Sequence, residues 1–105
     1  MNDYDGTTTI LNVSGDKIDN NCLNVLKFMQ KTGLNCHIVP NKTVIGDKIE
    51  NGCIITLAGV KPDIIEKKVW KNLEKEFDLK CAFMEMKRDY AGCVRNFFRP
   101  SNCIT

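Results

Sequence analysis

The sequence lacks any apolar run long enough to cross a membrane, and it has few of the residues on which common catalytic sites depend. No stretch approaches the roughly 20 apolar residues of a spanning helix, so we expect no membrane insertion. The 105 residues include one histidine, one tryptophan and three prolines. A P-loop, a nucleophile elbow, an H-E-x-x-H helix and a Rossmann glycine pattern are all missing. These absences predict a protein that is not an enzyme and that holds no metal or cofactor.

Cysteine is abundant, with six copies in the chain: Cys22, Cys36, Cys53, Cys81, Cys93 and Cys103. No C-x-x-C pair occurs, and with His37 as the single histidine the usual spacing of a structural zinc site is absent. The acidic, polar N-terminus is unlike a secretory signal, so we expect an intracellular protein, in which disulfides are rare. This favours reduced thiols over a disulfide framework or a redox function, which are the other two interpretations.

Length and composition predict one globular domain with a single two-layer core. The chain of 105 residues is 43% hydrophobic and 27% charged, which is ordinary for such a domain. Its net charge of +2 is too small to indicate nucleic-acid binding by itself.

The order of the apolar patterns predicts the fold. Apolar residues alternate, as in strands, or recur at helical spacing in six consecutive segments: residues 7–13, 22–33, 34–45, 53–58, 62–77 and 79–86. The resulting order is strand, helix, strand, strand, helix, strand. It predicts an α+β protein with a ferredoxin-like βαββαβ two-layer sandwich, in which two helices cover one face of a four-stranded antiparallel sheet.

Local features predict several details. Gly33 is suited to end the first helix, and Pro40 places its strand at an edge of the sheet because proline donates no ladder hydrogen bond. The almost wholly apolar residues 53–58 predict a central strand. Pro62 suits the entry to the second helix, where Asp63 with Glu66 three residues later is typical of a capping box.

The phase of each pattern predicts which side chains face the core. In the first helix we expect the buried stripe to consist of Cys22, Leu23, Leu26 and Met29. In the last strand we expect Leu79, Cys81 and Phe83 on one face and Met84 and Met86 on the other. The face of the sheet away from the helices is then expected to carry Thr8, Ile10, Asn12, Ile54 and Thr56.

Three parts are expected along the chain: a flexible N-terminus at residues 1–6, the ferredoxin-like domain at 7–86, and a basic-aromatic tail at 87–105. An uncovered sheet face that is partly apolar indicates a homodimer or a protein partner docked on it.

Two segments around the first helix resemble a known family. Gly15-Asp16-Lys17 precedes that helix and Thr32-Gly33-Leu34-Asn35 follows it. They resemble the D-[RK]-x-G and h-G-x-N-I signals of ACT domains, which are small amino-acid-sensing regulatory modules. The glycine of the first signal is replaced here. The resemblance implies a small-ligand site whose candidate residues are Ser14, Gly15, Asp16, Lys17, Asn20 and Asn35.

A more distant similarity concerns residues 52–59, with the sequence G-C-I-I-T-L-A-G. This segment looks like the strand that precedes the last helix of small translation-initiation factors of the Sui family. Their basic N-terminal segment and additional first strand have no counterpart in this chain.

The tail offers the features of a nucleic-acid site. It interleaves cations with aromatic rings, which grip phosphates and stack on bases: Lys87, Arg88, Tyr90, Arg95, Phe97, Phe98 and Arg99. The other interpretation is that Phe97 and Phe98 pack back onto the open sheet face.

The sequence therefore predicts a non-catalytic binding or regulatory module that acts through dimerisation or through a protein partner docked on its sheet, with small-ligand binding as a further property. The second hypothesis is a protein that binds RNA or single-stranded DNA through the tail, as a translation factor would.

Overall fold

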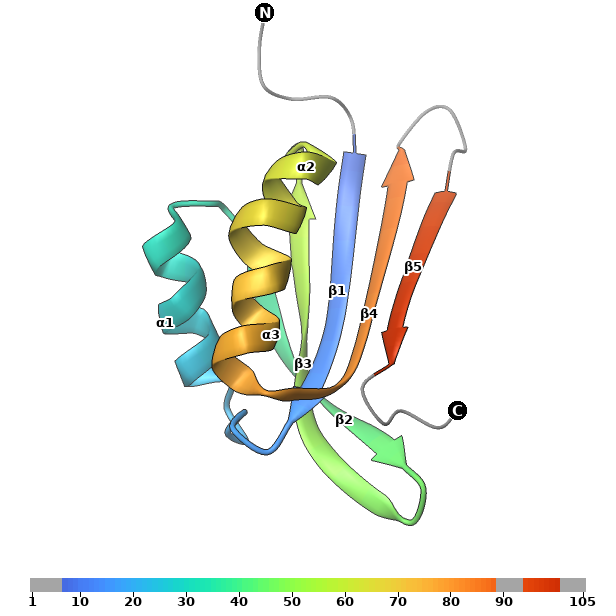
Figure 1. Ribbon diagram of the computed structural model, residues 1–105. Helices are drawn as coiled ribbons and strands as arrows, with labels where there is room; N and C mark the ends of the chain where they lie inside the picture. Colours follow the sequence, from blue (N-terminus) through green and yellow to red (C-terminus); the bar gives the residue numbers. More distant parts are fainter. Residues whose placement is uncertain (1–6, 89–93, 101–105) are drawn as a thin grey trace, which may run out of the picture.

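The computed structural model describes residues 7–88 and 94–100 and shows two layers. One layer is an antiparallel sheet with the strand order β2-β3-β1-β4-β5, and two helical stretches cover one of its faces (Figure 1). The elements are β1 (Thr7–Gly15), α1 (Leu23–Thr32), β2 (His37–Ile45), β3 (Lys48–Ala58), α2 (Pro62–Ile64), the π-helix η1 (Ile65–Trp70), α3 (Lys71–Phe77), β4 (Leu79–Arg88) and β5 (Val94–Pro100).

The predicted ferredoxin-like βαββαβ arrangement is confirmed by the first four strands and their two crossovers. β3 lies between β2 and β1, as its apolar sequence predicts, and β2 with Pro40 is an edge strand. The structure adds a fifth strand: β5 pairs with β4 along the segment that the sequence predicts as a tail. Within the described part of the chain, no helix is both long enough and apolar enough to cross a membrane.

The core lies between the sheet and the helical layer. From the sheet it receives alternating residues such as Leu11 and Val13 of β1 and Ile55 and Leu57 of β3, all with no exposed surface. Trp70 is the largest of the fully buried side chains that oppose them from the helices. Burial of such side chains is the main contribution to the stability of a domain of this size.

Helix α1 ends where the sequence predicts but buries a different stripe. Gly33 adopts the left-handed conformation at φ 75°, and its N–H donates to the carbonyl of Gln30. The buried helical residues are Val25 and Met29, whereas Leu23 and Leu26 are 52% and 37% exposed, so the prediction for those two is wrong. The segment before the helix explains why the buried stripe differs.

That preceding segment is a tight turn that rotates the first helical residues. Cys22 has a positive φ of 57° and is buried, and Asp19 Oδ1 accepts hydrogen bonds from the N–H groups of Asn21 and Leu23. The Asp19 side chain thus caps the start of helix α1.

The second helical stretch begins at Pro62. The N–H groups of Ile64 and Ile65 both donate to the carbonyl of Lys61, which places Asp63 inside the first turn rather than at the cap. The predicted capping role of Asp63 is therefore wrong, because the cap position is Lys61, two residues earlier. The stretch then widens into the π-helix η1, where the N–H of Lys71 donates to the carbonyl of Glu66.

Strand β4 contains a bulge that reverses the predicted alternation. Ser14 pairs with Cys81, but Gly15 pairs with Leu79, so Lys80 is left over between the two pairs. Leu79 is buried, and after the bulge Ala82 and Met84 are buried instead of Cys81 and Phe83. The prediction that Leu79, Cys81 and Phe83 share one face is wrong. The extra residue Lys80 shifts the alternation of side chains between the two faces by one position.

Candidate functional site

The bulge at Lys80 creates a cluster of three charged side chains at one end of the open sheet face. Lys80 Nζ lies 2.8 Å from Asp16 Oδ1, just after β1, and 2.9 Å from Glu50 Oε1 on β3. The side chain of Glu50 is only 15% exposed, against 33% for Lys80 and 70% for Asp16. Bulges often redirect a side chain in this way. We call these three residues the Lys80 cluster.

Charge pairing perturbs the ionisation of the cluster. The hydrogen bond with Asp16, followed by that with Glu50, raises the pKa of the Lys80 ammonium above its ordinary value. The hydrogen bond with Lys80 holds the pKa of the Asp16 carboxyl below its ordinary value. Both shifts favour the charged forms of Lys80 and Asp16, so the pair is held together as an ion pair.

Ser14 lies beside the cluster on the same face of the sheet. It is fully buried, and its Oγ has no hydrogen-bond partner among the described residues. Gly52 on β3 pairs with it, and a Cβ on Gly52 would lie only 2.3 Å from the carbonyl oxygen of Val13. Only glycine therefore permits this close approach of β3 to β1.

A hollow of about 270 Å³ lies near this end of the sheet. Its lining consists of Asn20 before α1, Pro40, Asn41 and Lys42 on β2, and Asn51 and Gly52 on β3. Asn41 Nδ2 also donates to Asn12 Oδ1 at 3.4 Å. Amide side chains both donate and accept hydrogen bonds, so this asparagine hollow, which Lys42 also lines, suits a polar part of a ligand.

The structure brings together most of the ligand residues that the sequence predicts, with one exception. Ser14, Gly15 and Asp16 lie at the end of β1, and Asn20 lines the asparagine hollow. Asn35 instead follows the other end of α1, a helix of 10 residues that separates it from the rest by about 15 Å.

Lys17 is the remaining predicted ligand residue. It is exposed, and its carbonyl accepts a hydrogen bond from the Asn24 side chain. Lys17 is therefore available to a ligand from the same loop, although it is not part of the Lys80 cluster.

The predicted nucleic-acid residues fall on or around β4 and β5. Lys87 and Arg88 belong to β4, and Arg95, Phe97, Phe98 and Arg99 belong to β5, with Phe98 opposite Phe83 in the register. Tyr90 lies outside the described residues. Pairing with β4 places β5 beside the sheet as an additional strand.

The cysteines follow two patterns. Cys22, Cys36 and Cys53 are free thiols, as predicted, and burial raises the pKa of each. Cys22 donates from Sγ to the carbonyl of Gly52 at 3.0 Å. Cys81 is disulfide-bonded, so the prediction of a reduced thiol is wrong there; its partner lies outside the described residues.

The open face of the sheet carries the residues expected for it. Ile10, Asn12, Ile54 and Thr56 are all half-buried, and Val39 of β2, opposite Ile54, is 38% exposed. In the described part of the chain, no three His, Cys, Asp or Glu side chains gather closely enough to hold a metal ion.

Comparison with known proteins yields one structural match. No family model and no curated protein matches this sequence. A solved structure described as a phage SAM lyase in its apo state matches with a TM-score of 0.65 over 95% of this chain and 93% of that chain, at 19% sequence identity. The fold is therefore shared over most of the length of both chains.

This match corrects the prediction that the chain is not an enzyme. The prediction relies on missing catalytic motifs, yet a chain of this architecture and length is an enzyme by its own description. Missing motifs of larger enzyme families therefore do not exclude catalysis on this fold. The ACT and Sui resemblances are not addressed by the match and stay predictions.

Sequence reasoning misses Glu50 and Lys80, the two less exposed members of the cluster. Glu50 lies between the two segments that the sequence predicts as strands, residues 34–45 and 53–58, whereas β3 already begins at Lys48. Lys80 lies between Leu79 and Cys81 in a regular apolar–polar–apolar pattern, so the sequence contains no signal of the bulge.

Proposed function

We propose that this chain is a lyase that acts on S-adenosylmethionine or a closely related sulfonium compound. The observation that carries the proposal is the structural match to a phage SAM lyase, because it extends over 95% of this chain and 93% of the other. A match of that extent leaves no extra domain to account for the other protein's activity. The polar end of the sheet supplies suitable chemistry in this chain.

The Lys80 cluster complements the charges of such a substrate. S-adenosylmethionine carries a positive sulfonium, an amino group, a carboxylate and an adenosine. The carboxylates of Asp16 and Glu50 attract the cationic groups, and the Lys80 ammonium attracts the substrate carboxylate. When the substrate carboxylate binds Lys80, it replaces one of the two protein carboxylates there. The displaced protein carboxylate can then face the sulfonium. The asparagine hollow suits the hydroxyl and amino groups of the nucleoside.

A lyase breaks a carbon–sulfur bond of this substrate without water or a redox partner. The bonding electron pair goes to the sulfonium sulfur, which leaves as a neutral thioether. The carbon left behind either forms a double bond after a base removes a neighbouring proton, or bonds to a nucleophile within the substrate. Glu50 is the candidate base, because it is a carboxylate that is mostly removed from water.

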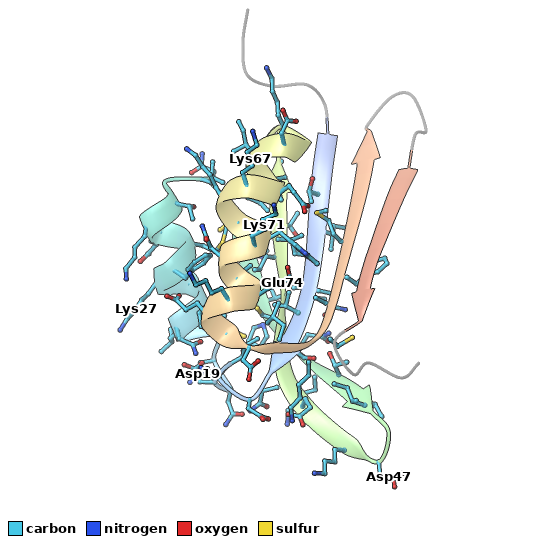
Figure 2. All side chains as sticks on the ribbon, in the orientation of Figure 1. Asp19, Lys27, Asp47, Lys67, Lys71 and Glu74 are labelled. Atoms are coloured by element: carbon cyan, nitrogen blue, oxygen red, sulfur yellow. The ribbon has the colours of Figure 1, made fainter. Side chains whose placement is uncertain are left out.

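An assay with purified protein tests the proposal. We expect S-adenosylmethionine to disappear with turnover, and the product identifies the bond: methylthioadenosine marks cleavage on the amino-acid side and methionine marks cleavage on the ribose side. Glu50→Gln and Lys80→Met should lower the rate by at least tenfold. Asp47→Asn, at the tip of the β2–β3 hairpin (Figure 2), is the matched control and should not. Intact substrate, together with no binding by calorimetry, would refute the proposal.

The open sheet face supports a second element of the proposal, association of two or more copies. Ile10, Ile54 and Val39 form an aliphatic surface that is only partly covered. Light scattering at several concentrations tests this, and a strict monomer would contradict it. An intracellular location also belongs to the proposal; the free thiols of Cys22, Cys36 and Cys53 support it, whereas the disulfide of Cys81 does not.

A further inference from the structure

A groove runs between α1 and the second helical stretch, on the helical layer and thus on the opposite side of the sheet from the Lys80 cluster (Figure 1). Its volume is about 450 Å³. The residues that matter for its chemistry are Phe28, Lys31, Lys67, Lys68, Asn72 and Glu76. A second hollow of about 420 Å³ shares Phe28, Asn72 and Glu76 with it and adds Lys75. We call the two together the helical groove.

The helical groove is strongly basic. Four lysines line it, against the single carboxylate of Glu76. Figure 2 shows further charged residues, Lys27, Lys71 and Glu74, on the same helical layer. Cations that converge on one concave surface attract an anionic ligand.

The π-helix explains why two consecutive lysines line one groove. In η1 the neighbouring residues Val69 and Trp70 are both buried, because the wider turn brings two adjacent positions to the core side. Lys67 and Lys68 are likewise adjacent, and both line the groove. Short π-helical segments are rare and occur frequently at functional sites. The segment thus supports the basic groove as a binding surface, independently of its charge.

An aromatic ring lies in the same groove. Phe28 is half-buried, and its ring packs edge-on to Phe77, with the centroids 5.8 Å apart at an interplanar angle of 83°. A ring held by such a contact and lining an open groove provides a rigid surface for a stacked base. Phosphate-binding side chains and a stacking surface are thus within one groove.

We propose that the helical groove binds a single strand of nucleic acid, with phosphates on Lys31, Lys67 and Lys68 and a base against Phe28. The distance along the helix from Lys67 to Lys75 is about 12 Å, which corresponds to roughly three nucleotides. A free phosphate ion would need a compact pocket with buried donors, whereas these lysines are exposed along an open groove. This site is separate from the proposed lyase site and stands or falls independently of it.

Fluorescence anisotropy with 5′-fluorescein-labelled dT12 and U12 tests the proposal, and the two strands separate DNA from RNA as the source of the phosphodiester. We expect dT12, U12 or both to bind at about 50 mM salt. The double variant Lys67→Glu/Lys68→Glu should weaken that binding at least tenfold. In this variant the plot of log K against log salt concentration should become less steep by about 1.4, because two phosphate contacts are lost and each contributes about 0.7 for a single strand. Phe28→Leu should weaken binding about fivefold or more.

The control reverses a charge outside the groove, Lys48→Glu at the start of β3, and should change affinity less than twofold. Circular dichroism melts confirm that each variant is folded, and Lys67→Gln/Lys68→Gln replaces the double charge reversal if that variant unfolds. No binding of either oligonucleotide, or an equal loss in the control, overturns the proposal. Binding that survives in the groove variants and is lost in Arg95→Ala/Arg99→Ala overturns it in favour of β5. Groove-dependent binding to phosphatidylserine vesicles without oligonucleotide binding overturns it in favour of a membrane.

Discussion

Lys80 of β4 donates a hydrogen bond to Glu50 of β3 over 2.9 Å, although β1 lies between their two strands. The contact is possible because the bulge frees Lys80 from the ladder at the point where β1 ends. The two residues therefore bring opposite charges together across the end of β1. This relationship defines the polar end of the sheet on which the proposed lyase activity depends.

The first prediction concerns the pH dependence that this cluster gives to stability. The pKa of Asp16 is lowered in the folded protein, so its contribution is present above the ordinary carboxyl value of about 3.9 and is lost as the pH falls through the lower folded value. The pKa of Lys80 is raised, so its contribution is present below about 10.4 and is lost as the pH rises through the higher folded value.

The measurement is the melting temperature of wild type and Lys80→Met between about pH 2 and 12. The difference between the two should be greatest from about pH 5 to 9 and should shrink at both extremes. Lys27→Met, on the outer side of α1 (Figure 2), is the control and should not show that profile. A difference that is constant over the whole range would show that charge pairing is not the cause.

The second prediction concerns Gly52. Gly52→Ala should destabilise the protein by about 3 kcal/mol, because the new Cβ would lie 2.3 Å from a backbone oxygen of β1 that cannot move without separating the strands. Gly46→Ala is the comparison: a Cβ there meets nothing within 4 Å, and the positive φ of 61° costs about 1 kcal/mol. Urea unfolding measures both, and equal losses would contradict the steric explanation.

The third prediction concerns the free thiols. Cys22 and Cys53 are buried and burial raises the pKa of both, so neither should react with iodoacetamide at pH 8 while the protein is folded. Cys36 is half-exposed and should be the first of the three to be alkylated. Peptide mass mapping after a time course gives the order. Early modification of Cys53 would indicate that β3 opens readily.

The fourth prediction concerns a buried hydroxyl. Thr9 Oγ1 has no hydrogen-bond partner in the described part of the chain and is fully buried. Thr9→Val keeps the shape and removes an unsatisfied polar group, so we expect stability to rise by about 1 kcal/mol. Thr56→Val, on the half-buried open face, should change it by less than about 0.5 kcal/mol. A loss of stability in Thr9→Val would reveal a partner for that hydroxyl.

The fold can be predicted from the sequence because its strongest signals are local. Gly33 at a left-handed helix end, Pro40 on an edge strand and the apolar β3 each appear in the structure as the pattern predicts. The site cannot be predicted in the same way, because Asp16, Glu50 and Lys80 come from three segments and meet through a bulge. A single extra residue at position 80 reverses the faces of β4, and no alternating pattern reveals it in advance.

The residue types also do not reveal which residues form the Lys80 cluster. Asp16 belongs to a segment that resembles a ligand loop, whereas Glu50 lies outside every segment whose pattern predicts a strand or helix. Burial of Glu50 depends on the tertiary contact with Lys80, so composition and spacing contain no sign of it.

The most direct test of the central claim is a mass-balanced time course of S-adenosylmethionine with the purified protein, followed by liquid chromatography and mass spectrometry. The account predicts that each molecule of substrate lost yields one molecule of thioether product, over many turnovers, and that Glu50→Gln slows the loss at least tenfold while Asp47→Asn does not. Loss at the same rate with and without protein, or equal rates for wild type and Glu50→Gln, would contradict it.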